Sequence, residues 1–269
     1  MPENPDVYTH GHADSVLRSH RNRTAANSAA YLLPHLRPGL SLLDVGSGPG
    51  TITADLARLV APGPTLGIEP VEDPLAEARA TGAGIATLRF EVADVYRLDP
   101  AAGRYDVVHA HQVLQHLTDP VAALRAMGSV LTDDGVVAVR DADYAAMTWF
   151  PADERLDAWL ATYRAVAKSN GAEPDAGRRL YAWARKAGFA EVTASASVWC
   201  YATPEERAWW GGAWAERITR SRVAEQAVER GIADRGDLEE MSAGWRAWAA
   251  DPDGWFALLH GEVLARRPS

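Results

Sequence analysis

Three alternate glycines between a strand-like run and a helix-like segment constrain this chain more than any other feature. The apolar run is Leu42–Val45, the glycines are Gly46, Gly48 and Gly50, and residues 52–59 have helical character. Glycine lets the backbone turn sharply and lets a ligand approach it closely. The free N–H groups at the start of the following helix favour an anionic group. We therefore expect a ligand-binding strand–loop–helix unit of an α/β protein.

The spacing of these glycines and the acid before them discriminate between ligands. A dinucleotide-binding loop reads Gly-x-Gly-x-x-Gly, which places a pyrophosphate at the helix N-terminus. Here the loop reads Gly-x-Gly-x-Gly, and Asp44 lies two residues before the first glycine. A carboxylate there repels a pyrophosphate and suits a ligand with an ammonium group beside its carboxylate. S-adenosylmethionine (SAM) is such a ligand, whereas a nicotinamide-dependent oxidoreductase is disfavoured.

The composition restricts the classes of partner. The chain has 269 residues, of which 47% are hydrophobic, and a formal net charge of −9. An acidic chain lacks the basic face typical of nucleic-acid binders, so we expect a small-molecule substrate and no nucleic acid. No apolar run of about 18 residues is present, which predicts no membrane span. The first residues do not resemble a signal peptide, and a single cysteine, Cys200, fits a cytoplasmic protein. The oligomeric state is not indicated.

Strands and helices alternate along the first half, which implies parallel strands with right-handed crossovers. The expected strands are residues 42–45, 65–69, 87–92, 105–110 and 136–140, and the helices between them are residues 52–60, 73–81 and 121–131. Further helices are expected at residues 14–36, 152–169 and 176–187. Two more strands, at residues 192–201 and 256–265, flank a helical section that begins with a capping box at residues 203–206. All ten tryptophans lie at or after Trp149.

The order of these features resembles the class I SAM-dependent methyltransferases. The resemblance is carried by the glycine loop at residues 44–50, by Glu69 ending the second strand, by Asp94 after the third, and by residues 134–135 before the fifth. Within that class, the chain is most similar to the menaquinone/ubiquinone-biosynthesis-like group. A narrower similarity to fungal thiol methyltransferases of the gliotoxin type rests on short stretches at residues 23–27, 110–113, 140–141 and 253–256.

The resemblance implies a fold and a division of the chain. The fold is α/β, with a doubly wound, Rossmann-like sheet of seven strands whose last strand is antiparallel. Helical lid insertions and an N-terminal helical segment complete it. We expect an N-terminal helical cap at residues 1–40 and a SAM-binding core at residues 41–145. Residues 146–269 then hold the lid insertions, at 152–174 and 203–253, together with the last core helix and strands.

The same resemblance assigns cofactor-binding residues by position. The glycine loop lines the methionine part, and Asp44 orients its ammonium group. An acid such as Glu69 can accept both ribose hydroxyls. Asp94 and Val95 contact the adenine. The full expected set is Arg23, Asp44, Gly46, Ser47, Gly48, Gly50, Glu69, Pro70, Asp94, Val95, His111 and Gln112. An ordinary turn for Asp94 and a solvated helix face for Arg23 remain alternatives.

The expected reaction is methyl transfer to a small, partly apolar metabolite, with a free thiol as the favoured acceptor. Since the sulfonium already makes the methyl group electrophilic, the enzyme mainly positions the nucleophile, and a thiolate needs no strong base. Carbon or hydroxyl acceptors would need one, and His111, His116 and Asp141 are the candidates. The alternatives are a C- or O-methyltransferase of a quinone-like, polyketide or phenolic molecule, and a catalytically silent SAM-fold binding protein. The histidine spacings fit no zinc signature, so no metal is expected.

Aromatic residues in the lid suit an apolar substrate. Trp149, Trp209, Trp210 and Trp214 are candidates for the pocket, together with Tyr8 and His10 in a segment expected to fold over the cofactor. Tryptophans at helical spacing are more often core than pocket, and this alternative stays open.

Overall fold

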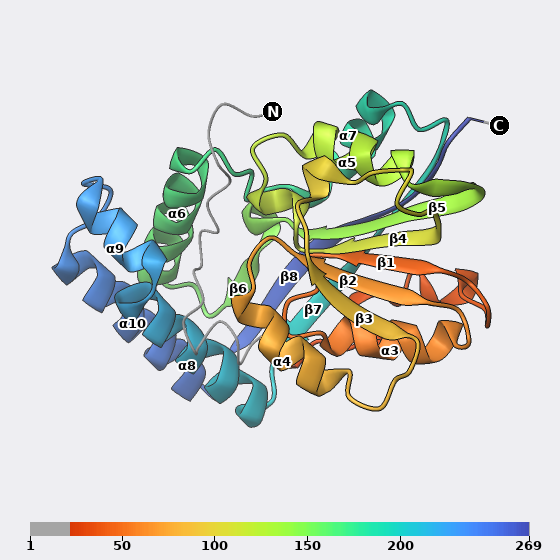
Figure 1. Ribbon diagram of the computed structural model, residues 1–269. Helices are drawn as coiled ribbons and strands as arrows, with labels where there is room; N and C mark the ends of the chain where they lie inside the picture. The colour runs from red at the N-terminus through yellow and green to blue at the C-terminus, as the bar shows by residue number, and fades with distance from the viewer. Residues whose placement is uncertain (1–21, 269) are drawn as a thin grey trace.

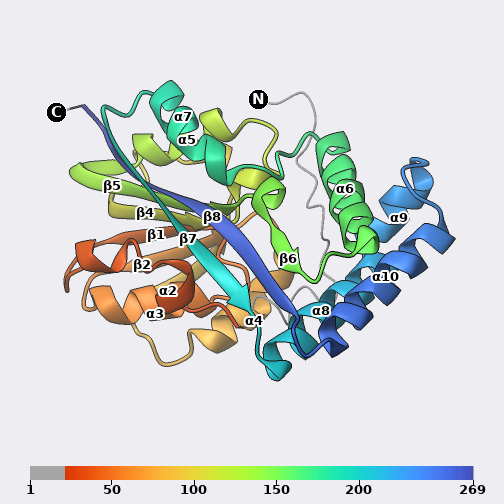
Figure 2. The same cartoon turned by 180° about the vertical axis from the view of Figure 1, so that it is seen from behind.

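The computed structural model describes residues 22–268, which form an eight-stranded sheet with helices on both faces and a helical cluster beyond one end (Figures 1 and 2). The strands are paired in the order β3-β2-β1-β4-β5-β8-β6, and β7 pairs with the other edge of β8. Five strands are parallel: β1 (Leu42–Val45), β2 (Thr65–Glu69), β3 (Leu88–Val92), β4 (Tyr105–His111) and β5 (Leu131–Ala142).

The last strand, β8 (Trp255–Arg266), is antiparallel to β5 and to β7 (Glu191–Tyr201). The predicted class I methyltransferase sheet with its antiparallel last strand is therefore confirmed. One strand was not predicted. The three-residue strand β6 (Thr148–Phe150) pairs with the part of β8 that reaches beyond the end of β5.

Two layers of helices bury the faces of the sheet (Figure 1). On one face, α3 (Thr51–Val60) packs its apolar side on strand residues such as Leu42 and Val107, and α4 (Asp73–Thr81) lies beside it. On the other face, α5 (Pro120–Ser129) and α7 (Leu180–Ala187) cover Val108 and Val139. Each face thus has its own apolar core, and the carboxyl ends of the parallel strands are left for the site.

Four helices form the cluster beyond the carboxyl ends of the strands: α6 (Glu154–Ser169), α8 (Pro204–Arg220), α9 (Arg222–Glu229) and α10 (Arg235–Ala250). The predicted capping box starts α8, because the Thr203 side chain accepts from the Glu206 N–H and the Glu206 side chain accepts from the Thr203 N–H. The core of this cluster is aromatic. Trp159, Trp214 and Trp245 are fully buried, and Trp159 makes edge-on contacts with the other two at 4.6 and 4.7 Å.

The single helix expected at residues 14–36 is wrong over residues 22–36. The structure has a short helix, α2 (Ala25–Ser28), and a 3-10 turn, η1 (Leu33–His35). Thr24 and Asn27 form a reciprocal capping box, which starts a new helix at Ala25. Pro34 has no N–H to donate, so it cannot continue an α-helix. Residues 14–21 lie outside the described residues.

The boundary between α5 and β5 also differs from the prediction. The helix was expected to run to residue 131 and the fifth strand to begin at residue 136, yet β5 already begins at Leu131. The pairing with β4 shifts register between Tyr105 opposite Leu131 and Val107 opposite Val136. The polar residues 132–135 lie in this irregular part of the strand.

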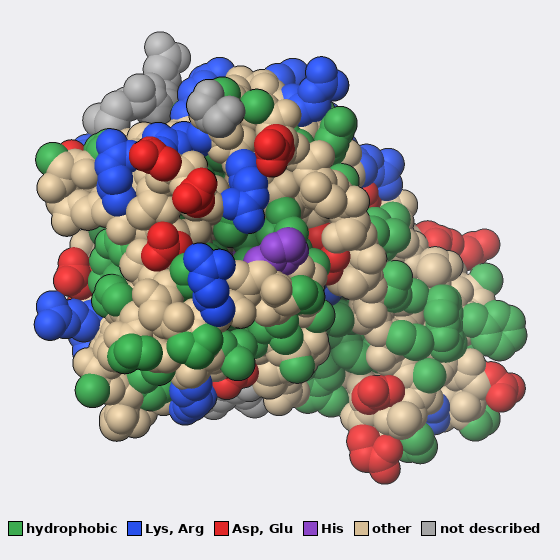
Figure 3. Space-filling model, turned by 90° about the vertical axis from the view of Figure 1, so that its right-hand side faces the viewer, with side chains coloured by type: hydrophobic (Ala, Val, Ile, Leu, Met, Phe, Trp, Pro, Cys, Tyr) green, Lys and Arg blue, Asp and Glu red, His purple; other side chains and the backbone are tan. Residues whose placement is uncertain are grey.

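The surface carries charges of both signs. Viewed from the right-hand side of Figure 1, basic and acidic side chains lie next to one another with hydrophobic side chains between them (Figure 3). Within residues 22–268, no helix is long and apolar enough to cross a membrane.

Candidate functional site

The glycine loop between β1 and α3 is fixed to the end of β2. Gly46, Gly48 and Gly50 all have positive φ, at 70°, 52° and 79°. The N–H groups of Gly46 and Ser47 both donate to the carbonyl of Ile68, at 2.9 and 3.1 Å. The loop therefore has one defined shape, and that shape uses backbone conformations that favour glycine.

Two of these glycines are also required by their neighbours. A Cβ atom at Gly46 would lie 2.4 Å from Cγ2 of Val113, and one at Gly50 would lie 2.9 Å from the ring of Phe90. The loop thus packs directly against the segment that follows β4. The hydroxyl of Ser47 is buried without a protein partner among the described residues, so a ligand or water is needed to satisfy it.

Glu69 ends β2 beside this loop. Its Oε1 accepts a hydrogen bond from the Gly48 N–H at 2.5 Å. Burial raises the pKa of Glu69 to about 7, Asp44 adds to the rise, and the Gly48 N–H opposes it. Pro70, the next residue, is exposed. The predicted ribose acceptor therefore lies against the glycine loop with a carboxyl group that changes charge near neutral pH.

Asp44 is buried below the loop. Its Oδ2 accepts from the Thr53 hydroxyl at 2.5 Å, and its Oδ1 lies 2.7 Å from Nδ1 of His109. Both carboxylate oxygens are therefore held by protein groups, and Asp44 as a whole is only 3% exposed. Thr53 and His109 were not predicted as part of the site, although His109 lies directly opposite Asp44 in the β1–β4 register.

Asp94 and Val95 lie after β3, where η2 (Val95–Arg97) begins. The Asp94 side chain accepts from the Tyr96 N–H at 2.9 Å and caps this turn. Val95 is buried. Asp94 therefore performs the ordinary turn function, and its contact with the adenine stays a prediction.

A row of polar residues crosses the sheet at the carboxyl end of β4. His111 lies opposite Arg140 of β5, which lies opposite Glu262 of β8, which lies opposite Ser195 of β7. Arg140 and Glu262 form a buried ion pair at 3.3 Å. Sequence reasoning did not single out Glu262, and it used Arg140 only as part of a family resemblance.

The buried ion pair has further partners. Ser195 and Ser197 donate to Glu262 at 2.7 and 2.5 Å. The guanidinium of Arg140 lies 4.8 Å from the ring centroid of Trp199, a cation–π contact. The pair is thus in contact with two hydroxyl donors and an aromatic ring, all from β7.

Gln112 connects three distant parts of the chain. Its backbone has a φ of 54°, and its N–H donates to the carbonyl of Arg140 at 2.7 Å. Arg23 donates to its Oε1 at 2.7 Å, and its Nε2 lies 2.8 Å from Nε2 of His260. The structure therefore brings together Arg23 and Gln112, which were predicted as cofactor residues, and adds His260 on β8, which sequence reasoning missed.

Two of the three candidate bases, His111 and His116, are in poor environments for accepting a proton, whereas burial makes the carboxylate of Asp141 more basic. Burial, followed by the nearby charges of Arg23 and Arg140, holds the pKa of His111 well below its usual range. Burial and Arg23 lower the pKa of His116 to about 3. Burial raises the pKa of Asp141 to about 7, and its Oδ1 accepts from the Gln115 N–H at the turn η3 (Leu114–His116).

The predicted pocket tryptophans occupy different environments. Trp210 and Trp214 are buried in the aromatic core of the helical cluster, at 5% and 1% exposed. Trp149 and Trp209 are partly buried and pack on that core, with Trp149 stacked on Phe256 at 6.0 Å. Their contact with substrate stays a prediction. Tyr8 and His10 lie outside the described residues.

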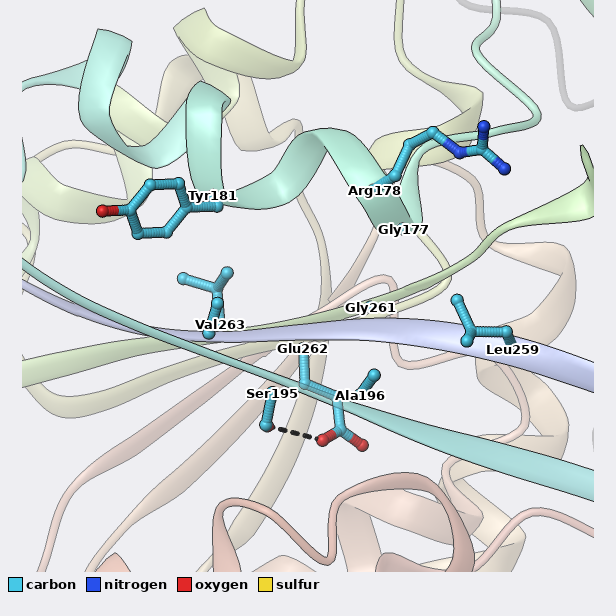
Figure 4. A pocket seen from close by; sticks show the side chains of 10 residues that line it. Gly177, Arg178, Tyr181, Ser195, Ala196, Leu259, Gly261, Glu262 and Val263 are labelled. Carbon is cyan, nitrogen blue, oxygen red and sulfur yellow. Dashed lines mark hydrogen bonds between the residues drawn. The ribbon is translucent and has the colours of Figure 1, made fainter. Parts of the chain in front are cut away.

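A small cavity of about 210 Å³ lies elsewhere, between α7 and the outer strands β7 and β8. Figure 4 shows Tyr181 on one side of these strands and the hydrogen-bonded pair Ser195 and Glu262 on the other. None of the glycine-loop residues lines this cavity. Among residues 22–268, no group of three or more His, Cys, Asp or Glu side chains is placed to hold a metal ion.

Residues 17–194 match the family model described as a methyltransferase domain. The chain belongs to this methyltransferase family. An uncharacterized methyltransferase of Schizosaccharomyces pombe is 29% identical over 276 residues, covering 99% of this chain and 98% of that protein. A ubiquinone biosynthesis O-methyltransferase of Cereibacter sphaeroides is 33% identical over 99 residues, covering 37% of this chain and 40% of that protein.

Solved structures support the fold. The phosphoethanolamine N-methyltransferase 2 of Haemonchus contortus, in complex with phosphomonomethylethanolamine and S-adenosylhomocysteine, superposes with a TM-score of 0.56 at 16% identity, covering 97% of this chain and 58% of that one. The protein is a SAM-dependent methyltransferase of class I. Its site fits the cofactor. The glycines leave the loop without side chains at three positions, and the buried hydroxyl of Ser47 has no hydrogen-bond partner among the described residues. The carboxyl group of Glu69 lies next to the same loop.

Proposed function

We propose that the protein transfers the methyl group of SAM to a thiol of a small, partly apolar metabolite. The observation that carries this proposal is the lowered pKa of the two candidate histidines, His111 and His116. A base whose pKa is about 3, such as His116, is far too weak to ionise a phenol, whose pKa is about 10. A thiol has a pKa near 8.5, so a few per cent is already thiolate near neutral pH.

The glycine loop and the residues around it would hold the cofactor. The backbone at Gly46, Ser47, Gly48 and Gly50 would take the methionine part, and Glu69 would accept the ribose hydroxyls. Asp44 would act on the ammonium group through the groups that it already binds, Thr53 and His109. When bound, the cofactor supplies an electrophilic methyl carbon.

The chain's own task is to place the acceptor and to exclude water. His111 lies at the carboxyl end of β4, and the aromatic cluster lies beyond the carboxyl ends of the strands. Partly buried Trp149 and Trp209 are the aromatic side chains best suited to contact an apolar acceptor. Positioning alone can lower the barrier by about 7–11 kcal/mol.

Glu69 predicts a pH dependence of SAM binding. Hydroxyl donors favour the carboxylate over the carboxylic acid, so binding should lower the raised pKa of about 7. Affinity for SAM should therefore rise as the pH increases from 6 to about 7 and then level off. Calorimetric titrations with SAM across pH 6–8 measure this. Glu69→Gln should weaken binding by ~1–3 kcal/mol and flatten the profile.

The exposed neighbour Glu72 is the matched control, since its pKa is lowered by Arg79 instead of raised. Glu72→Gln should keep the wild-type profile. A Glu69→Gln protein that retained the full pH dependence would remove Glu69 from the ribose site.

Because Asp141 is buried, its replacement by asparagine is expected to stabilise the protein. Folding raises the pKa of this buried carboxyl from 3.8 to about 7, so folding favours the protonated form. Stability is then fully present below about pH 4 and is lost as the pH rises towards 7. Asp141→Asn cannot ionise and keeps an oxygen for the Gln115 N–H. Urea unfolding should find it about 4 kcal/mol more stable than wild type at pH 8 and nearly equal at pH 4. Equal stability at pH 8 would contradict this.

The acceptor is tested by incubating the protein with SAM and a panel of reduced dithiols, phenols and quinols, read by mass shift. We expect methylated thiols, and His111→Ala and Asp141→Ala should change the rate only modestly. Methylation confined to phenols or ring carbons would refute the thiol proposal and leave the methyltransferase assignment intact.

The second candidate is O- or C-methylation of a quinone-like or phenolic molecule. It is favoured by the match to a ubiquinone biosynthesis O-methyltransferase. Under this function, removal of the base should lower the rate by roughly 10²–10⁴-fold. The size of the His111→Ala effect therefore distinguishes the two acceptor classes.

A further inference from the structure

Gln112 has an unusual backbone conformation. Among residues 22–268 it is the one non-glycine residue with a positive φ, at 54°. A left-handed conformation is unfavourable for an L-residue, because its Cβ atom comes too close to the following carbonyl oxygen. A residue stays in such a strained conformation when several surrounding contacts hold it there, and strained residues are frequent at functional sites. Three hydrogen bonds from separate segments hold Gln112, namely those with Arg23, Arg140 and His260.

The donors and acceptors define the orientation of the Gln112 side chain. Arg23 can only donate, so the group that faces it must be the carboxamide oxygen of Gln112. The carboxamide nitrogen then faces Nε2 of His260 and donates to it. This assignment requires a neutral His260 whose Nε2 is free of a proton.

The surroundings of His260 keep its ring neutral. The ring is fully buried, 4.4 Å from the ring of Trp199 and 6.1 Å from that of His111. Burial, followed by the charges of Arg140 and Arg23, holds the pKa of His260 well below its usual range. The imidazole is therefore a neutral hydrogen-bond acceptor for Gln112.

Gln112 directly precedes the residue that packs against the glycine loop. The next residue, Val113, is the one whose side chain would collide with a Cβ atom at Gly46. A shift of Gln112 would carry Val113 with it and change the packing against the glycine loop. His260 itself lies on β8, the strand that directly follows the helical cluster through α10. The side chain of His260 thus lies between the strand that follows the helical cluster and Gln112, which precedes the residue packed on the glycine loop.

We propose that His260 is a positioning residue, which holds the Gln112 carboxamide and thereby keeps the segment after β4 packed against the glycine loop. It acts through Gln112 and does not react with the acceptor. The inference deepens the proposed function, because it concerns the same site. It depends on cofactor binding and is independent of which atom accepts the methyl group.

A double-mutant cycle tests this role through the affinity for S-adenosylhomocysteine, measured by calorimetry. His260→Phe removes the acceptor but keeps a planar ring, and leaves the half-buried carboxamide N–H of Gln112 without its partner. We expect the dissociation constant to rise about tenfold. In a Gln112→Gly background, which also relieves the backbone strain, His260→Phe should change the constant by less than about twofold. Equal effects of His260→Phe in both backgrounds would overturn the proposal.

Two further variants separate positioning from a loss of stability. His260→Gln retains an oxygen that can accept from Gln112 and should restore affinity to within about threefold of wild type. Ser195→Ala loses a hydrogen bond to Glu262, which lies on β8 as His260 does. This variant should lower the melting temperature without changing the affinity for S-adenosylhomocysteine. If Ser195→Ala weakens binding as much as His260→Phe, the effect is structural and the proposal fails.

Steady-state kinetics test the role of His260 separately from the identity of the methyl acceptor. With any acceptor that is methylated, His260→Phe should raise KM for SAM more than it lowers kcat. A large fall in kcat with an unchanged KM would overturn the positioning role. Failure of the thiol acceptor in the panel would leave the titration with S-adenosylhomocysteine unaffected.

Discussion

Replacing Gly48 with valine is expected to abolish SAM binding in a folded protein. Gly48 has a φ of 52° and donates its N–H to Glu69 at the centre of the loop. A β-branched residue is a poor fit to this conformation. Its side chain would also occupy the space that the cofactor needs. Calorimetry with SAM and S-adenosylhomocysteine should find a loss of affinity of at least roughly 100-fold, equivalent to about 2.8 kcal/mol.

Gly84 provides a matched control for backbone strain. It also has a positive φ, 86°, but it is exposed, and a Cβ atom there meets nothing within 4 Å. Gly84→Val should therefore suffer similar strain and keep wild-type affinity for SAM. Unchanged SAM affinity in a folded Gly48→Val protein would contradict the assignment of the loop. A similar loss of affinity in Gly84→Val would attribute the effect to strain alone.

The core strands could be predicted from the sequence because their signals are local. The bounds of β1 and β2 match the prediction, since buried apolar runs are bounded there by glycine and proline. The start of α5 is equally local: the Asp119 side chain accepts from the Ala122 N–H, and Pro120 occupies the first helical position.

Two errors arose where tertiary pairing decides the structure. Three residues carry no periodicity, so β6 could not be found; it forms because β8 continues past the end of β5 and offers a free edge. The irregular start of β5 likewise depends on its partner β4, which tolerates the polar residues 132–135 between two paired positions. Turn signals in the sequence describe only the local preference.

The site was predictable only in part, for the same reason. The glycine loop and Glu69 are contiguous with strong motifs. His260 and Glu262 are not, because only the β5–β8 register places them beside Gln112 and Arg140. A signal was nevertheless present: a histidine and a glutamate two residues apart interrupt an otherwise apolar strand. Buried polar groups of this kind need partners, so they mark a network even when the partners are unknown.

Replacing Arg140 with methionine is expected to have the largest effect on stability. Arg140 is 1% exposed and Glu262 is 5% exposed. Loss of the guanidinium leaves the Glu262 carboxylate buried with only Ser195 and Ser197 as hydrogen-bond donors. Breaking a buried ion pair in this way costs about 3–5 kcal/mol. Urea unfolding at pH 7 measures the loss. The exposed pair of Arg58 and Asp55 is the control, and Arg58→Met should cost less than about 1 kcal/mol.

The double variant Arg140→Met/Glu262→Met separates the value of the pair from the cost of breaking it. Burial lowers the pKa of Arg140 to about 10, although Glu262 acts to raise it. Folding therefore penalises this charge more than its partner compensates, and the pair is not expected to stabilise the fold on balance. The double variant should recover most of the stability that Arg140→Met loses. If it is as unstable as the single variant, the ion pair makes a net contribution to folding, and the row of polar residues across β4, β5, β8 and β7 is a structural element in its own right.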